Sequence, residues 1–169
     1  MSPKLHAFTM NFGLLLLRVG VGSAFVAHGV GKLAAGPEVW TKLGGAMTNL
    51  GVDFLPGVWG FIASLTEMVG GLLLVAGLCT RVAALLLAFV MFVALEMHIN
   101  SGDSFKGFSH ALELLFVFAG VTFTGPGDFS ADGLRMRQRC RAAQLAAKSA
   151  PTPAPTAVPP APPSGNVAS

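Results

Sequence analysis

Hydrophobic and polar positions divide the first 127 residues of the chain into long apolar stretches separated by short polar breaks. Four stretches are long and apolar enough to span a bilayer, at about residues 10–33, 57–79, 82–99 and 108–125. A membrane-spanning helix needs about 20 apolar residues, and four soluble core helices would need far more amphipathic cover. The pattern therefore predicts an all-α fold, a bundle of four transmembrane helices.

A weaker pattern lies between the first two stretches. Large apolar side chains recur there at spacings of three, four and three residues: Trp40, Leu43, Met47 and Leu50. Pro37 precedes them, and proline is typical of the first position of a helix. We expect a short amphipathic helix outside the membrane, either a surface anchor or a lid over the mouth of the bundle. The short connection at residues 77–81 predicts an antiparallel hairpin of the second and third spans.

Composition supports a lipid environment and suggests three parts. The chain is 53% hydrophobic and 11% charged, whereas charged residues make up about 25% of an average soluble protein. Residues 1–127 are expected to form the transmembrane domain, and residues 128–148 a basic juxtamembrane segment. Residues 149–169 are rich in proline and alanine and are expected to be disordered.

The distribution of lysine and arginine predicts the orientation, because cytoplasmic loops carry an excess of both. Most of these residues fall on the side of the two termini: Lys4, Arg81, Arg135, Arg137, Arg139, Arg141 and Lys148. Fewer fall on the other side: Lys32, Lys42 and Lys106. We expect a multi-pass protein of the inner (plasma) membrane with both termini in the cytoplasm. Cys79 and Cys140 would then face a reducing compartment, which argues against a structural disulfide.

Ionisable side chains inside the apolar stretches are the main functional signal. They are Arg18, His28, Glu67, Glu96, His98, His110 and Glu113. A charge at the bilayer centre costs about 3 kcal/mol on insertion scales, so such groups are expected to pair or to face a cavity. We expect Glu67 to pair with Arg18 or His28, and His98, His110 and Glu113 to lie near the external mouth.

Helical spacing supports this convergence. One face of the first span carries residues at spacings of four, three, four and three: Arg18, Gly22, Phe25, Gly29 and Lys32. The second span has a comparable small and polar stripe: Gly60, Ser64, Glu67 and Gly71. Small residues of this kind let membrane helices approach closely. Both stripes are therefore expected to face the interior of the bundle.

The ionisable cluster has two interpretations. In the first it is structural, and buried ion pairs fix the register of the helices without a ligand. In the second it is a site for a small polar or quinone-like ligand, or a proton relay. No haem-attachment motif supports ligation of a haem by His98 and His110. The sequence contains no P-loop, CxxC or catalytic-triad motif, and no metal site is expected.

Three segments together resemble the DoxX family of small bacterial membrane proteins, and one of them, residues 91–98, resembles the end of its third helix. Residues 17–33, LRVGVGSAFVAHGVGKL, are similar to the Arg…Phe…His-Gly…Lys-Leu opening of that family. Residues 67–85, EMVGGLLLVAGLCTRVAAL, are similar to its Glu-x-x-Gly-Gly…Gly-Leu…Thr-Arg signature. The resemblance extends over about residues 12–125 and implies a four-helix integral membrane protein.

The resemblance also implies redox chemistry, because the family is linked to the small subunit of thiosulfate:quinone oxidoreductase and to thiol and oxidative-stress systems. The residues it carries over to this chain are Arg18, His28, Lys32, Glu67 and Arg81.

Our leading hypothesis is an accessory or quinone-interacting subunit of a membrane redox system. Glu67 and His28 would handle protons as the catalytic residues. The cofactor-binding residues would be Arg18, His28, Lys32, His98, His110 and Glu113. The expected partners are the lipid bilayer and a soluble redox protein on the cytoplasmic side. A second copy of the chain, in a homo-oligomer, is a further candidate partner, and no nucleic acid is expected. The alternatives are a small-solute carrier and a membrane scaffold without catalytic activity.

Overall fold

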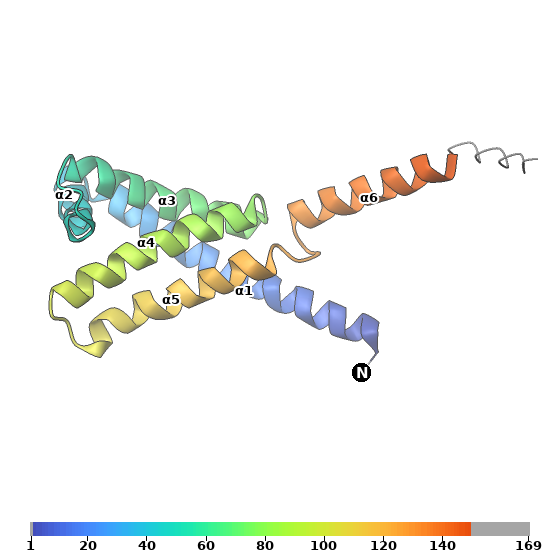
Figure 1. Ribbon diagram of the computed structural model, residues 1–169, viewed down its shortest axis with the longest axis horizontal. Helices are drawn as coiled ribbons and strands as arrows, with labels where there is room; N and C mark the ends of the chain where they lie inside the picture. The colour runs from blue at the N-terminus through green and yellow to red at the C-terminus, as the bar shows by residue number, and fades with distance from the viewer. Residues whose placement is uncertain (1, 150–169) are drawn as a thin grey trace, which may run out of the picture.

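Four long helices cross one another in a computed structural model that describes residues 2–149 (Figure 1). They are α1 (Pro3–Ala34), α3 (Pro56–Ala76), α4 (Thr80–Asn100) and α5 (Phe105–Thr124). All four are long and apolar enough to span a membrane. No strand occurs in residues 2–149. The predicted all-α fold with four transmembrane helices is confirmed.

Local sequence signals fix several helix ends. Proline stands at the start of α1, α2 and α3, where its missing N–H costs nothing and its fixed φ suits the first helical turn. Helix α3 ends at Gly77, which has a φ of 68°. The N–H of Leu78 donates to the carbonyl of Leu73 at 3.0 Å, a pattern that closes many helix C-termini. The chain then turns directly into α4, as the short connection predicted.

Helices α1 and α3 run antiparallel and touch through their glycines. A Cβ on Gly71 would lie 2.6 Å from the carbonyl oxygen of Gly22, and a Cβ on Gly29 would overlap the backbone of Met68. The residues that α1 buries are those of the predicted stripe: Arg18, Gly22, Phe25 and Gly29. The predicted stripe on α3 is buried as well. Small residues therefore do bring these two backbones together.

The apolar core fills only one half of the bundle. Phe25 and Phe118 meet edge to face with ring centroids 4.8 Å apart, beside buried residues that flank the α3–α4 turn, such as Leu74 and Ala83. Away from that turn α3 and α4 spread apart (Figure 1). The other half is therefore where cavities form.

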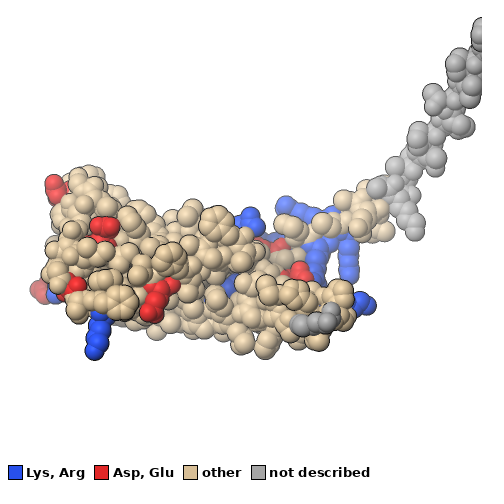
Figure 2. Space-filling view, turned by 60° about the horizontal axis from the view of Figure 1, so that its bottom comes forward, with Lys and Arg blue, Asp and Glu red and all other residues tan. Residues whose placement is uncertain are grey.

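The two ends of the bundle differ in charge and in cover. Figure 2 shows lysine and arginine gathered at one end, around α6 (Ala131–Ser149), and a middle with little charge. We call this the basic end; it also holds the α3–α4 turn and the start of α1. We call the opposite end the capped end. It is covered by α2 (Pro37–Gly44) and the 3₁₀ helix η1 (Gly45–Leu50), and it holds the α4–α5 loop.

Two predicted boundaries need correction. Helix α1 begins at Pro3, seven residues earlier than expected. Residues 4–9 contain no proline or glycine that would interrupt a helix. The amphipathic helix predicted to run from Trp40 to Leu50 stops at Gly44 and continues as η1, since paired glycines disfavour an α-helical interior. The basic segment forms α6, and the predicted disordered tail lies outside the described residues from 150 onward.

Candidate functional site

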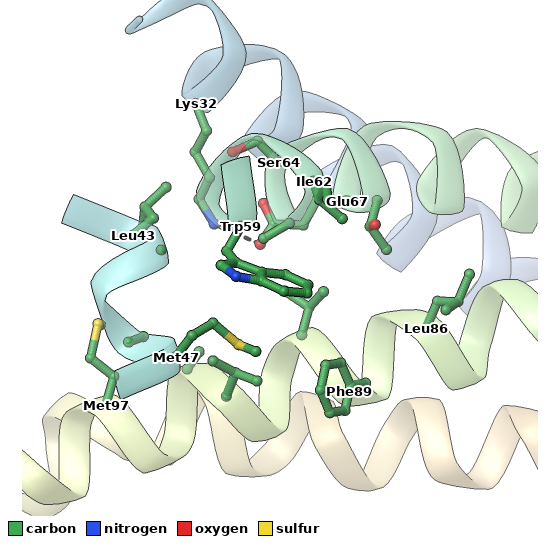
Figure 3. A pocket seen from close by; sticks show the side chains of 17 residues that line it. Lys32, Leu43, Met47, Trp59, Ile62, Ser64, Glu67, Leu86, Phe89 and Met97 are labelled. Carbon is green, nitrogen blue, oxygen red and sulfur yellow. Dashed lines mark hydrogen bonds and ion pairs between the residues drawn. The ribbon is translucent and has the colours of Figure 1, made fainter. Parts of the chain in front are cut away.

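An ion pair joins α1 to α3 inside the bundle. The ammonium group of Lys32, in the last turn of α1, donates a hydrogen bond of 2.6 Å to Oε1 of Glu67, in the middle of α3. The Glu67 side chain is 2% exposed and the Lys32 side chain 33%. Figure 3 shows the lysine reaching toward this carboxylate beside Trp59.

The prediction that Glu67 pairs with Arg18 or His28 is therefore wrong. Gly29 lies against the backbone of Met68, which places Lys32, the next residue along that face, within reach of Glu67. Arg18 precedes Gly29 by 11 residues, or about 16 Å along the helix axis, so it lies at another level of the bundle. The register of α1 against α3 decides the partner.

A first cavity of about 260 Å³ lies next to this ion pair, between α3 and α4 and under η1. Most of its lining is apolar, and two methionines contribute to it, Met47 and Met97 (Figure 3). Two buried polar atoms on lining residues have no hydrogen-bond partner among the described residues, Oε2 of Glu67 and Nε1 of Trp59. One is an acceptor and the other a donor, and a buried polar atom left unpaired is costly.

The first cavity opens toward the side of the bundle that would face lipid. Three apolar residues line it and are also exposed: Ile62 at 44%, Leu86 at 49% and Phe89 at 53%. They lie on facing sides of α3 and α4. An apolar molecule dissolved in the bilayer could enter between these helices.

Helix α2 and η1 close the first cavity at the capped end. Trp40 donates from Nε1 to the backbone oxygen of Lys32 at 2.9 Å and packs edge to face on Phe61. Gly44 and Gly60 let α2 and α3 meet backbone to backbone, because a Cβ on either would overlap a carbonyl of the other helix. The residues of this segment that line the cavity are Leu43, Gly44, Ala46 and Met47. The structure thus favours a lid over a plain surface anchor.

A second cavity of about 170 Å³ lies on the other side of the ion pair, between α1, α4 and α5. It brings together five of the predicted site residues: His28, Lys32, Glu67, His98 and His110. Lys32, Glu67 and Ala94 line both cavities. His98 Nδ1 lies 2.6 Å from Oδ2 of Asp103 in the α4–α5 loop.

Glu113 needs a correction. Its side chain is exposed on α5 and lines neither cavity, so the predicted grouping with His98 and His110 at the mouth does not form. Residues three apart on a helix point about 60° apart, and this difference leaves Glu113 outside the second cavity while His110 lines it.

Arg18 lies at the basic end, away from both cavities. It is 1% exposed, and its Nη2 donates to the backbone oxygen of Phe129 at 2.7 Å. Asp132, in the first turn of α6, accepts from the N–H of Thr80 at 3.2 Å, and its own N–H donates to the carbonyl of Gly77 at 3.0 Å. Arg18 thus holds the segment before α6 against α1, and Asp132 holds the start of α6 against the α3–α4 turn. Arg18 lines neither cavity, and its Nε and Nη1 are buried without a hydrogen-bond partner among the described residues; its cofactor-binding role stays a prediction.

Arg81 also lies at the basic end. It is exposed, and its guanidinium lies beside the backbone of Gly125 at the end of α5.

Trp59 is the site residue that the sequence analysis missed. It precedes Ala63 and Glu67 at spacings of four, so all three share one face of α3, and all three line the first cavity. This spacing was the signal available in the sequence. A tryptophan near the end of a span is also typical of an interfacial aromatic belt, so its position alone does not indicate that it lines a cavity.

Comparisons with known proteins agree with the architecture. The DoxX family model matches residues 13–99, just over half of the chain. A relative in Bacillus subtilis (strain 168), named "Putative oxidoreductase CatD", is 30% identical over 87 residues. The match covers 52% of this chain and 60% of that relative, so the chain spans less than two thirds of it. No solved structure matches the chain.

The family match covers α1 from Gly13, the lid, α3 and nearly all of α4. It therefore includes the Lys32–Glu67 ion pair and every residue that lines the first cavity. Together with the four spanning helices, this match establishes that the chain is a multi-pass membrane protein of the DoxX family.

Proposed function

We propose that the first cavity binds the ring of a quinone or quinol, and that the protein is an accessory, quinone-interacting subunit of a membrane redox system. The observation that carries the proposal is a pair of buried, unpartnered polar atoms, one on Glu67 and one on Trp59, on residues that line an apolar cavity open toward lipid. Ligand sites typically combine an apolar lining with a few polar groups that fix orientation.

The size of the first cavity suits a single ring. At about 260 Å³ it lies just below the range of roughly 300–1,000 Å³ typical of pockets for drug-sized ligands. The isoprenoid tail of a quinone is apolar, and the exposed mouth at Leu86 and Phe89 would let such a tail remain in the bilayer. A polar, fully hydrated solute would gain little from this lining.

The two free polar atoms suit the two oxygens of such a ring. The indole N–H of Trp59 can donate to a carbonyl or hydroxyl oxygen, and Oε2 of Glu67 can accept from a hydroxyl. Glu67 is held by Lys32 through its other oxygen, so the free oxygen is fixed in place. A quinol presents the hydroxyl that a carboxylate needs, and we expect it to bind more tightly than the quinone.

The redox role would require a partner. A quinol that loses two electrons and two protons becomes a quinone, and the electrons would pass to a redox protein with its own electron-accepting group. The protons would pass to Glu67 and onward by way of His28. The name of the Bacillus subtilis relative, an oxidoreductase, supports this class of chemistry, and thiol, sulfur or oxidative-stress systems are the expected setting.

The basic end supports a cytoplasmic orientation of both termini in the inner membrane. It carries the start of α1, Arg81 and the arginines of α6 (Figure 2), and cytoplasmic segments are enriched in such residues. A soluble partner with an acidic surface would dock there.

Equilibrium dialysis against a short-chain benzoquinol and benzoquinone, with the protein in mild detergent, tests the proposal. Trp59→Phe keeps the aromatic surface and removes the N–H; loss of one neutral hydrogen bond should weaken quinol affinity roughly 2- to 12-fold. Glu67→Gln removes a charged acceptor and should weaken it roughly 10- to 100-fold. The matched control is Glu113→Gln, an exposed position on α5 that lines neither cavity. Binding that is absent in the wild type, or equal in all four proteins, would refute the proposal.

A further inference from the structure

We infer that the second cavity is a water-filled path by which Glu67 exchanges protons with the aqueous phase at the capped end. This access to Glu67 does not depend on which ligand occupies the first cavity. Three features indicate it: the lining of the second cavity, the depth of that cavity and the free oxygen of Glu67.

The lining of the second cavity favours water. It holds three imidazoles, the ammonium of Lys32 and the carboxylate of Glu67, whereas Lys32 and Glu67 are the only titratable side chains that line the first cavity among residues 2–149. Buried water needs polar partners and roughly 10–30 Å³ per molecule, and apolar cavities stay dry. A cavity of about 170 Å³ with these groups has room and partners for several water molecules.

The depth of the second cavity matches a path from the headgroup level to the middle of the membrane. His98 lies two residues before the end of α4 and Gly107 two residues after the start of α5, about 3 Å along each helix, and both line the second cavity. Phe25 and Leu114, each nine residues or about 14 Å from the capped end of its helix, line it as well. The second cavity thus connects residues near the capped surface with a carboxylate near mid-span.

The groups around Glu67 can carry protons. From α1 it is faced by Lys32 and His28, from α4 by His98 and from α5 by His110. Imidazole accepts a proton on one nitrogen and releases one from the other, which suits a relay. His98 is anchored to Asp103 in the α4–α5 loop, so the relay begins beside an exposed acidic side chain.

Glu67 has a free position at which a proton can arrive. Its Oε1 is taken by Lys32, and its Oε2 is buried without a partner among the described residues. The same oxygen could exchange a proton with a ligand in the first cavity, because Glu67 lines both cavities. Glu67 would then link a dry ligand cavity to a wet proton path.

Cysteine labelling in lipid nanodiscs tests the inference. The free cysteines Cys79 and Cys140 are first replaced by serine. Glu67→Cys and Leu114→Cys then place a thiol on the second cavity, and Phe116→Cys places one on the exposed apolar side of the same helix α5. The thiolate forms only where water reaches the sulfur; it attacks a charged, water-soluble methanethiosulfonate reagent, forms a mixed disulfide and displaces methanesulfinate.

We expect both cavity positions to react at least roughly tenfold faster than Phe116→Cys, because only they are hydrated. Leu114→Cys alone decides this comparison if Glu67→Cys does not fold. A rate for Leu114→Cys as slow as that of Phe116→Cys would overturn the inference.

Two plugging substitutions identify the route. His110→Trp narrows the mouth of the second cavity and should slow labelling of the Glu67→Cys or Leu114→Cys variant. Leu86→Trp narrows the mouth of the first cavity and should leave the rate unchanged. Slowing by Leu86→Trp alone would show that water arrives by the lipid-facing route, which contradicts the inference. Because no quinone is present, this outcome is independent of the dialysis experiment.

Discussion

Removing Lys32 from the Lys32–Glu67 ion pair should destabilise the protein much more than removing Glu67. The carboxylate side chain is 2% exposed and the ammonium side chain 33%. Lys32→Met leaves both oxygens of Glu67 buried and unpartnered, and removing one partner of a buried pair costs about 3–5 kcal/mol. Glu67→Leu leaves a lysine that can move its ammonium toward water, so that substitution should cost about 1 kcal/mol.

The double substitution should be milder than Lys32→Met alone. Replacing both members of a buried pair by apolar residues of similar size is often neutral, so the Lys32→Met/Glu67→Leu protein should lie within about 1 kcal/mol of the wild type. The coupling energy of the double-mutant cycle should then be about 4–6 kcal/mol if the double variant is as stable as the wild type.

The assay is reversible unfolding in mixed micelles of dodecyl maltoside and dodecyl sulfate, followed by tryptophan fluorescence and helical circular dichroism. Glu113→Gln provides the control for loss of an exposed carboxylate on α5. Equal costs for the two single substitutions, or costs that simply add in the double variant, would refute the assignment of Glu67 as a buried, lysine-dependent carboxylate.

Three further predictions concern packing and the two ends of the bundle. Gly29→Ala should destabilise the protein by about 1–3 kcal/mol in the same assay, because the added Cβ overlaps the backbone of α3. The control Gly20→Ala should have little effect, because its Cβ meets nothing within 4 Å. Gly60→Ala should push the lid away and weaken quinol binding in dialysis, and Gly45→Ala, with open space around its Cβ, should not. Arg18→Met removes the hydrogen bond that holds the segment before α6 and should speed amide hydrogen exchange there, with unchanged exchange in the lid; equal protection in both proteins would show that Arg18 is not the fastener.

The sequence predicted which faces of α1 and α3 are buried because the polar and small residues on them stand out against the apolar remainder. Arg18, Gly22 and Gly29 on α1 recur at helical spacing, and so do Ser64 and Glu67 on α3. A charge or a glycine in a membrane span has few other roles, so the pattern identifies the interior face directly.

The partner of Glu67 could not be predicted in the same way. It depends on how far α1 is shifted along α3, and that shift is fixed by backbone contact at Gly29, which helical spacing alone does not encode. The same holds for Glu113 and Trp59. Lipid is as apolar as the protein core, so apolar neighbours in the sequence do not show whether these residues face the bundle or the lipid.

Small molecules that copurify with the protein in mild detergent, identified by mass spectrometry, show whether the first cavity holds a quinone-type ring. We expect a quinone or quinol bound to the wild type and to Glu113→Gln, and depleted in Glu67→Gln and Trp59→Phe. A wild-type protein free of quinone, or one whose quinone content is the same in all four proteins, would contradict it.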